Sequence, residues 1–206
     1  MCIIGADSAV GAPLALLLQR SKLIDDLALY GRVRPERLAA ELSCIPERPT
    51  IEAYGSSNDG LFCALKGAQL VLLAEGAFRT SVKREEHFET HAKAACEYGK
   101  AIGEEVPNAL VGVLTSPISA MLPLVWECVR RSGGRLPERR VLGGATLPAA
   151  RVAAQAARLL NVDPASLKVY VGGGTCGTSA VPLLSALGEE HRLTQVRIHH
   201  TNRTPL

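Results

Sequence analysis

The sequence lacks any apolar run long enough to cross a membrane. Its longest apolar stretches, such as Pro13 to Leu18 and Gln69 to Leu73, are far shorter than the ~20 residues that a membrane-spanning helix needs. It also lacks internal repeats, low-complexity segments and a basic, serine-rich leader, so we expect no targeting segment within this chain. With 47% hydrophobic residues among 206, the chain is long enough to bury a core, which predicts a globular protein of one or two domains.

Paired cysteines at short spacing are absent too. The chain has six cysteines with no CxxC pair and no histidine at ligand spacing: Cys2, Cys44, Cys63, Cys96, Cys128 and Cys176. Zinc sites and disulfide frameworks usually show such spacing. We therefore predict no metal site, no disulfide framework and an intracellular, reducing compartment.

Charge of one sign is not in excess. The net charge of +3 arises from 23 basic and 20 acidic residues, which is too weak a bias to indicate nucleic-acid binding. The densest basic stretch runs from Arg130 to Arg140 and frames a Gly-Gly turn. It is either a solvated turn or a surface for an anionic partner.

Short apolar runs rich in β-branched residues alternate with segments of helical period, which is typical of a parallel sheet built from βαβ units. The predicted strands are 2–5, 27–30, 51–54, 70–74, 110–115 and 140–143. The predicted helices are 11–20, 35–43, 58–66, 84–102, 120–131 and 147–160. We predict a Rossmann-like, doubly wound α/β domain over residues 1–145. A smaller α+β lobe over 146–206 would include the helix 147–160, a strand at 168–172 and a short strand around Val196 and Ile198.

The first predicted βα turn has the setting of an anion site. Gly5 ends a strand and Gly11 begins a helix, whose free N–H groups and dipole favour a diphosphate. A dinucleotide site usually needs a third glycine between them, and Ser8 stands there instead. Its hydroxyl would crowd a pyrophosphate. From spacing alone, Gly5, Ser8 and Gly11 fit a vestigial cofactor site or a simple tight turn.

Longer blocks of sequence resemble the mitochondrial and bacterial type of malate dehydrogenase. Between residues 5 and 185, in family order, the chain reads GADSAVGAPLALLLQRSKLIDDLALYG, LAAELSCIP, ALKGAQLVLLAEGAFR, VGVLTSPISAMLP, VLGGATLPAARVAAQAARLL and VGGGTCGTSAVPLLS. The resemblance implies a dinucleotide-binding domain followed by part of a substrate domain, with the family's C-terminal region missing. NAD is the cofactor that it implies.

In that family, an acidic residue after the second strand holds the adenosine ribose. The matching position here is Gly31, followed by Arg32, which could instead meet a 2′-phosphate. The family also grips a dicarboxylate with three arginines, because a guanidinium can hold a carboxylate through two parallel hydrogen bonds. The resemblance places these at Arg79, Arg84 and Arg151, either as a retained anion site or as inherited surface residues.

The catalytic positions of the family have lost their chemistry in this chain. The resemblance places Thr175 where the family has its proton-accepting histidine, and Pro148 where it has the aspartate that orients that histidine. The substrate-positioning asparagines correspond to Ser116 and Ser119. We therefore predict no catalytic residue. Two other groups do not replace them: Cys176 has no histidine to activate it, and His87 and His91 are expected to be two exposed helix residues rather than a metal pair.

Three functions remain open at this point. The first is a pseudoenzyme that serves as a structural or interaction subunit of a larger, organellar assembly and binds no cofactor. The second is an NAD-dependent malate dehydrogenase with reduced activity. The third is a regulatory module that binds a nucleotide or dicarboxylate without turnover. Because an incomplete second lobe would expose apolar strand faces, we expect a protein partner to cover it. The resemblance favours a mitochondrial location.

Overall fold

The computed structural model describes residues 1–46, 49–57, 59–76, 84–135, 137–174 and 179–184. It divides into two compact units, Met1–Gly144 and Ala145–Leu206. This division falls after Gly144, one residue before the domain boundary that the sequence predicts after residue 145.

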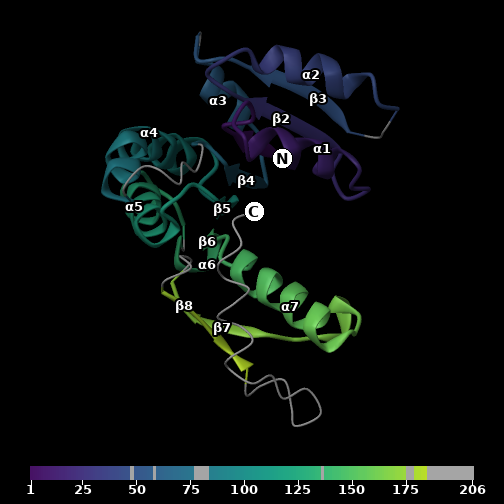
Figure 1. Cartoon of the computed structure of the whole chain (residues 1–206). Coiled ribbons are helices and arrows are strands. Elements are labelled where there is room, and N and C mark those ends of the chain that lie inside the picture. Colours follow the sequence, from purple (N-terminus) through teal and green to yellow (C-terminus); the bar gives the residue numbers. More distant parts are fainter. Residues whose placement is uncertain (47–48, 58, 77–83, 136, 175–178, 185–206) are drawn as a thin grey trace. The chain divides into compact units, whose positions relative to one another are not determined.

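The first unit is built on a parallel sheet of six strands in the order β3-β2-β1-β4-β5-β6 (Figure 1). The strands are β1 (Cys2–Ile4), β2 (Asp26–Tyr30), β3 (Thr50–Tyr54), β4 (Leu70–Leu73), β5 (Leu110–Val113) and β6 (Val141–Gly143). The order reverses between β1 and β4, which pair in register from Cys2 with Val71 to Ile4 with Leu73. This topology confirms the predicted Rossmann-like, doubly wound sheet.

Helices connect the strands at the predicted places. They are α1 (Gly11–Gln19), α2 (Pro35–Ser43), α3 (Gly60–Leu65), α4 (Arg84–Glu105), α5 (Ile118–Arg131) and the short α6 (Pro137–Arg140). Helix α4 extends three residues beyond the predicted end at Ile102. Helix α6 was not predicted, because one turn is too short to show an apolar period.

Each face of the sheet carries its own apolar core. Cys2 and Ile4 of β1 pack on one face together with residues of α3, α4 and α5. Ile3, between them, points to the opposite face and packs with residues of α1 and α2. Successive side chains of a strand point to opposite faces, so a parallel sheet covered on both sides needs continuous apolar strands. This requirement explains the sequence Cys-Ile-Ile in β1.

The second unit consists of α7 (Leu147–Leu160), a 3₁₀ turn η1 (Pro164–Ser166) and an antiparallel pair, β7 (Tyr170–Gly173) and β8 (Ala180–Leu183). The turn is capped by the Asp163 carboxylate, which accepts a hydrogen bond from Ala165 N at 3.0 Å. Strand β7 begins two residues later than predicted. The strand predicted around residues 196–198 lies outside the described residues.

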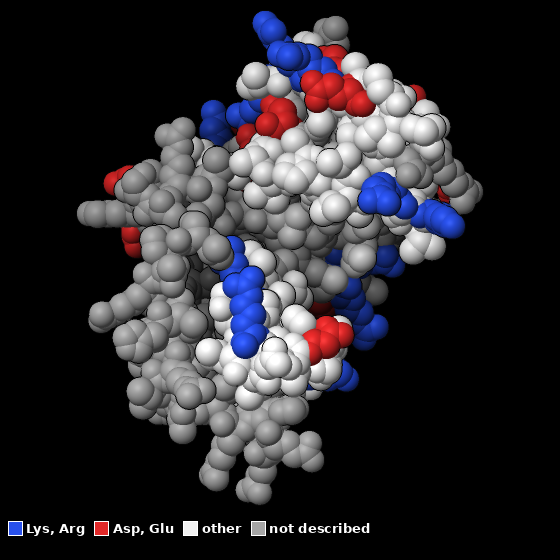
Figure 2. Space-filling model, turned by 45° about the vertical axis from the view of Figure 1, so that its right-hand side comes forward, with Lys and Arg blue, Asp and Glu red and all other residues white. Residues whose placement is uncertain are grey.

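The basic stretch is partly neutralised within the first unit. Glu127 of α5 accepts hydrogen bonds from Arg130 at 2.8 Å and from Arg131 at 2.6 Å. Arg140 donates to the carbonyl of Asn108. On the face shown in Figure 2, described basic side chains are interspersed with acidic and uncharged ones.

Among the described residues, no helix combines the length and apolar character that a bilayer crossing requires.

Replacement of a buried strand residue should be costly. Leu73 of β4 is almost fully buried, so we expect Leu73→Ala to lower the free energy of unfolding by about 2–5 kcal/mol through lost burial and a residual cavity. Leu17 of α1 is 69% exposed, and Leu17→Ala should change stability by less than about 0.5 kcal/mol. Urea unfolding followed by circular dichroism compares the two variants, and equal losses would contradict the placement of these residues.

Candidate functional site

The strand that follows β1 in the chain lies on one side of the β1–β4 pair, and the strand that follows β4 lies on the other side. Folds of this kind bind ligands in the space beyond the carboxyl ends of these two strands. The turn Gly5 to Gly11 borders this space. Gly5 has φ +81°, and a Cβ on it would lie 2.5 Å from the Glu75 backbone. A Cβ on Gly11 would overlap the carbonyl oxygen of Gly5. Both glycines are therefore required by close backbone packing, whatever the turn binds.

The hydroxyl of Ser8 occupies the amino end of α1. Its Oγ accepts hydrogen bonds from Gly11 N at 2.8 Å and from Val10 N at 3.3 Å. The same hydroxyl donates to the carbonyl of Ala74, at the end of β4, at 2.6 Å. It thus satisfies N–H groups that an anion would use. It also joins the two loops across the reversal of strand order.

A carboxylate lies beside Gly31, although the sequence has no acid at that position. Asp7 of the first turn accepts a hydrogen bond from Val33 N at 2.5 Å. A Cβ on Gly31 would lie 2.7 Å from Oδ1 of Asp7. The carboxylate of Asp7 therefore fills the space that any side chain at residue 31 would enter. Sequence reasoning missed Asp7, because only folding brings the first turn to the end of β2.

Three side chains form a polar cluster at the carboxyl ends of β2 and β4. Arg32 Nε lies 3.2 Å from Glu75 Oε1 and donates to the hydroxyl of Tyr98 on α4 at 3.1 Å. The Tyr98 hydroxyl donates to the other oxygen of Glu75. Burial, followed by the hydrogen bond to Glu75, raises the pKa of Tyr98 well above its usual range. The sequence offered Arg32 as a ligand for a 2′-phosphate. In the structure Arg32 makes an ion pair with Glu75 of the same chain.

Sequence reasoning missed Glu75 and Tyr98. A usable signal was present for Glu75, since a charged residue directly after a buried parallel strand lies at the ligand-binding edge of such a sheet. Tyr98 gave no comparable signal, because it reads as part of the apolar stripe of a long helix. Its ring packs edge-on against Tyr30, with ring centroids 6.0 Å apart.

A small pocket lies beside this cluster and is lined in part by Glu75, His91, Tyr98 and Thr115. Burial lowers the pKa of His91, whose ring stacks on His87 with centroids 6.4 Å apart. His87 is only 7% exposed and His91 is half-buried, so the expectation of two exposed histidines is wrong. It failed because the helix presents His87 to the protein interior. Within the described ranges, no three potential metal ligands gather.

The described residues do not test the predicted dicarboxylate site of three arginines. Arg79 lies outside them, and for Arg84 only the backbone at the start of α4 is described. Arg151 is exposed on α7 of the second unit. Of the two positions matched to the catalytic dyad, Pro148 lies in the first turn of α7 and Thr175 is outside the described residues. The arginine site therefore stays a prediction.

The sheet order and the glycine turn at its reversal define a protein of the dinucleotide-binding α/β class. Comparison with known families narrows this class. Residues 1–143 match the model of the lactate/malate dehydrogenase NAD-binding domain. The chain belongs to the lactate/malate dehydrogenase family, and its first unit is a dehydrogenase-like NAD-binding domain. This confirms the resemblance inferred from the sequence.

The chain is 31% identical over 186 residues to the mitochondrial malate dehydrogenase of Sus scrofa, a match that covers 90% of this chain and 54% of that protein. It therefore spans about half the length of the curated relatives that it matches. Its fold is similar to the apo malate dehydrogenase of Picrophilus torridus, with a TM-score of 0.80, 23% identity and coverage of 97% of this chain and 63% of that one. It is also similar to the Eimeria maxima lactate dehydrogenase solved with NADH and oxamate, with a TM-score of 0.76, 22% identity and coverage of 97% and 60%.

The contact between Asp7 and Gly31 predicts a coupled effect of mutation. Gly31→Asp should lower the free energy of unfolding by about 1 kcal/mol, because the Asp7 carboxylate must turn away, lose its hydrogen bond from Val33 N and face a like charge. In the Asp7→Ala background the same substitution should cost clearly less. Chemical denaturation of the wild type, both single variants and the double variant measures this coupling. Strictly additive losses would show that the two residues do not interact.

Proposed function

We propose that this chain is a malate dehydrogenase-like pseudoenzyme that serves as an interaction subunit of a larger assembly and needs no bound NAD. The observation that carries the proposal is the internal occupation of the nucleotide crevice. The Ser8 hydroxyl takes the N–H groups at the start of α1, and Arg32, Glu75 and Tyr98 bind one another where β2 and β4 end. A dinucleotide would have to displace these contacts before it made its own.

The residues at the family's catalytic positions support the same proposal. Removal of a hydroxyl proton during hydride transfer needs a base that titrates near neutral pH. The positions matched to the histidine and aspartate hold Thr175 and Pro148, neither of which can accept that proton. A dehydrogenase of reduced activity would need a different base near the substrate.

A second candidate is a module that binds a nucleotide without turnover, and one observation favours it. The Asp7 carboxylate lies beside Gly31, the position that the family resemblance matches to the ribose-binding acid. A carboxylate that reaches this place from the first turn could accept hydrogen bonds from ribose hydroxyls. The internal contacts of Ser8 and Glu75 weigh against this candidate.

An exposed apolar face of the second unit supports the proposal of a protein partner. Strands β7 and β8 pair so that Tyr170 lies opposite Leu183 and Gly172 opposite Val181, which places these residues on one face. Tyr170, Val181 and Leu183 are 61%, 57% and 47% exposed. Leu184, directly after β8, packs against residues of α7. An apolar face on an antiparallel pair supports coverage by another protein. The mitochondrial malate dehydrogenases among the relatives support a mitochondrial assembly.

A titration with NADH tests the first part of the proposal. The wild type should give no saturable change in NADH fluorescence up to about 1 mM and no oxidation of NADH with oxaloacetate. Ser8→Gly frees the Gly11 N–H and should bring weak binding without turnover. Ser21→Gly, which removes a hydroxyl bonded to Leu23 N at the other end of α1, is the matched control and should bind nothing. Saturable binding by the wild type would favour the nucleotide module, and turnover would rule out a pseudoenzyme.

Purification of the tagged chain from its native source tests the second part. We expect a protein to co-purify in stoichiometric amount and to be lost from Val181→Lys, because a lysine cannot be buried unpaired in an apolar interface. Lys168→Glu, which also changes charge in the second unit, should retain the partner. The proposed surface is wrong if both variants behave like the wild type or if the wild type is a stable monomer without partners.

A further inference from the structure

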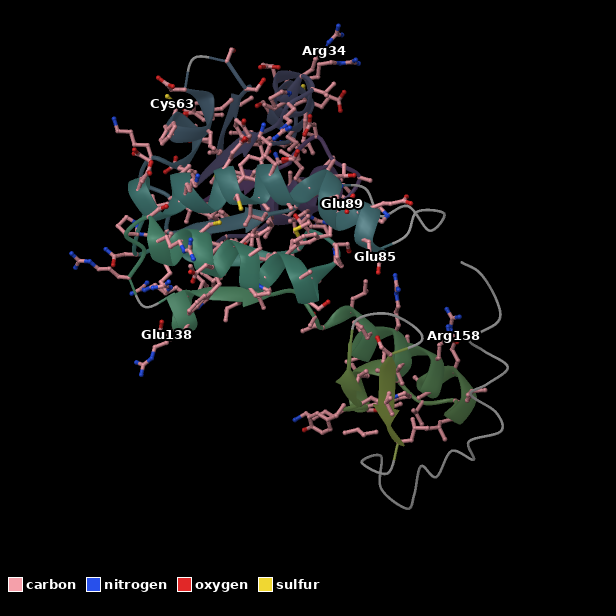
Figure 3. All side chains as sticks on the ribbon, turned by 90° about the vertical axis from the view of Figure 1, so that its left-hand side faces the viewer. Arg34, Cys63, Glu85, Glu89, Glu138 and Arg158 are labelled. Carbon is pink, nitrogen blue, oxygen red and sulfur yellow. The ribbon has the colours of Figure 1, made fainter. Side chains whose placement is uncertain are left out.

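Helices α4 and α5 pack side by side over the same face of the sheet (Figures 1 and 3). Two glycines of α4 allow their backbones to approach closely. A Cβ on Gly99 would lie 2.7 Å from Cβ of Cys128 and 3.2 Å from the carbonyl oxygen of Val125. A Cβ on Gly103, one turn later, would lie 2.8 Å from the carbonyl oxygen of Val129. The separation of the two helices is thus set by backbone packing rather than by flexible side chains.

This close packing brings together two cysteines that are 32 positions apart in the sequence. The thiol of Cys128 on α5 contacts Sγ of Cys96 on α4 at a distance of 3.2 Å. Both cysteines are half-buried and free of disulfides. A disulfide has an S–S length near 2.0 Å, so the two sulfurs need to approach by only about 1.2 Å. Solvent can reach the pair, so a small oxidant can too.

The geometry points to Cys96 and Cys128 as an oxidisable pair that forms a disulfide between α4 and α5 when a hydroperoxide is present. Spacing along the chain excludes a disulfide framework of the small secreted kind, and this pair is a separate case that depends on helix packing. Two residues beyond Cys96, the same helix carries Tyr98, which holds Glu75 and Arg32 in the nucleotide crevice. The disulfide would therefore fix the helix on which that cluster depends.

The chemistry balances with hydrogen peroxide as the only co-reactant. The Cys96 sulfur attacks one oxygen, the O–O bond breaks, and a sulfenic acid and hydroxide form. Cys128, whose pKa is raised by burial, is the second, resolving group, and it gives its proton to the hydroxide as it reacts. Its sulfur then attacks the Cys96 sulfur, the S–O bond breaks, and the second oxygen leaves as water. Two thiols lose two electrons and two protons, and the peroxide becomes two molecules of water.

The test compares the full chain after treatment with stoichiometric hydrogen peroxide and after reduction with dithiothreitol. We expect non-reducing peptide mapping to find the peptides of Cys96 and Cys128 joined, with the loss of two hydrogens. The cross-link closes a loop of the unfolded chain, so the melting temperature should rise by about 5–10 °C. Dithiothreitol should reverse both changes.

Matched serine variants identify the residues responsible. Cys96→Ser and Cys128→Ser should each abolish the cross-link and the rise in melting temperature. Cys44→Ser, at an exposed cysteine, should retain both. Peptide mapping of the wild type answers the question even if a serine variant fails to fold. The inference is overturned if Cys96 and Cys128 are recovered as sulfinic acids or unmodified thiols, or if peroxide joins Cys44 or Cys63 instead.

Discussion

Burial of both faces of one parallel sheet is the constraint on which the rest of the first unit depends. Strands with no solvent-exposed face must be apolar on both sides. Ile3 therefore packs in one core, and Cys2 and Ile4 pack in the other. Helices must then cover both faces, and the chain must change faces once. That change separates the connections that follow β1 and β4 and opens the space at their carboxyl ends. The candidate site is therefore a consequence of how the sheet is covered.

Side chains of the protein itself lie at the carboxyl ends of these strands and make hydrogen bonds and an ion pair there. A hydroxyl replaces the backbone approach that a glycine would allow, and it bonds to both sides of the crevice. Glu75 neutralises Arg32 and accepts a hydrogen bond from Tyr98, which is buried on the helix above. Buried polar groups need such partners, because each unpaired one costs free energy.

The second unit and the helix pair show two further consequences of packing. In β7 and β8, the pairing places Tyr170 and Leu183 on one face, and both are exposed. In α4 and α5, Gly99 lets the helices approach until Cys96 meets Cys128. An exposed apolar face and a close pair of thiols thus arise from the same rules that stabilise the fold.

The sequence by itself determined the fold class, the order of the strands and helices, and the family, because apolar period, glycine turns and long blocks of similarity are local features of the chain. It also located Gly5, Ser8 and Gly11 at the first turn. Only the tertiary structure decided what these residues contact: that Ser8 bonds to Ala74, that Asp7 takes the space beside Gly31, and that His87 is buried. Such contacts join residues that are far apart in the sequence, and their geometry depends on the packing of the whole unit, which no local pattern records.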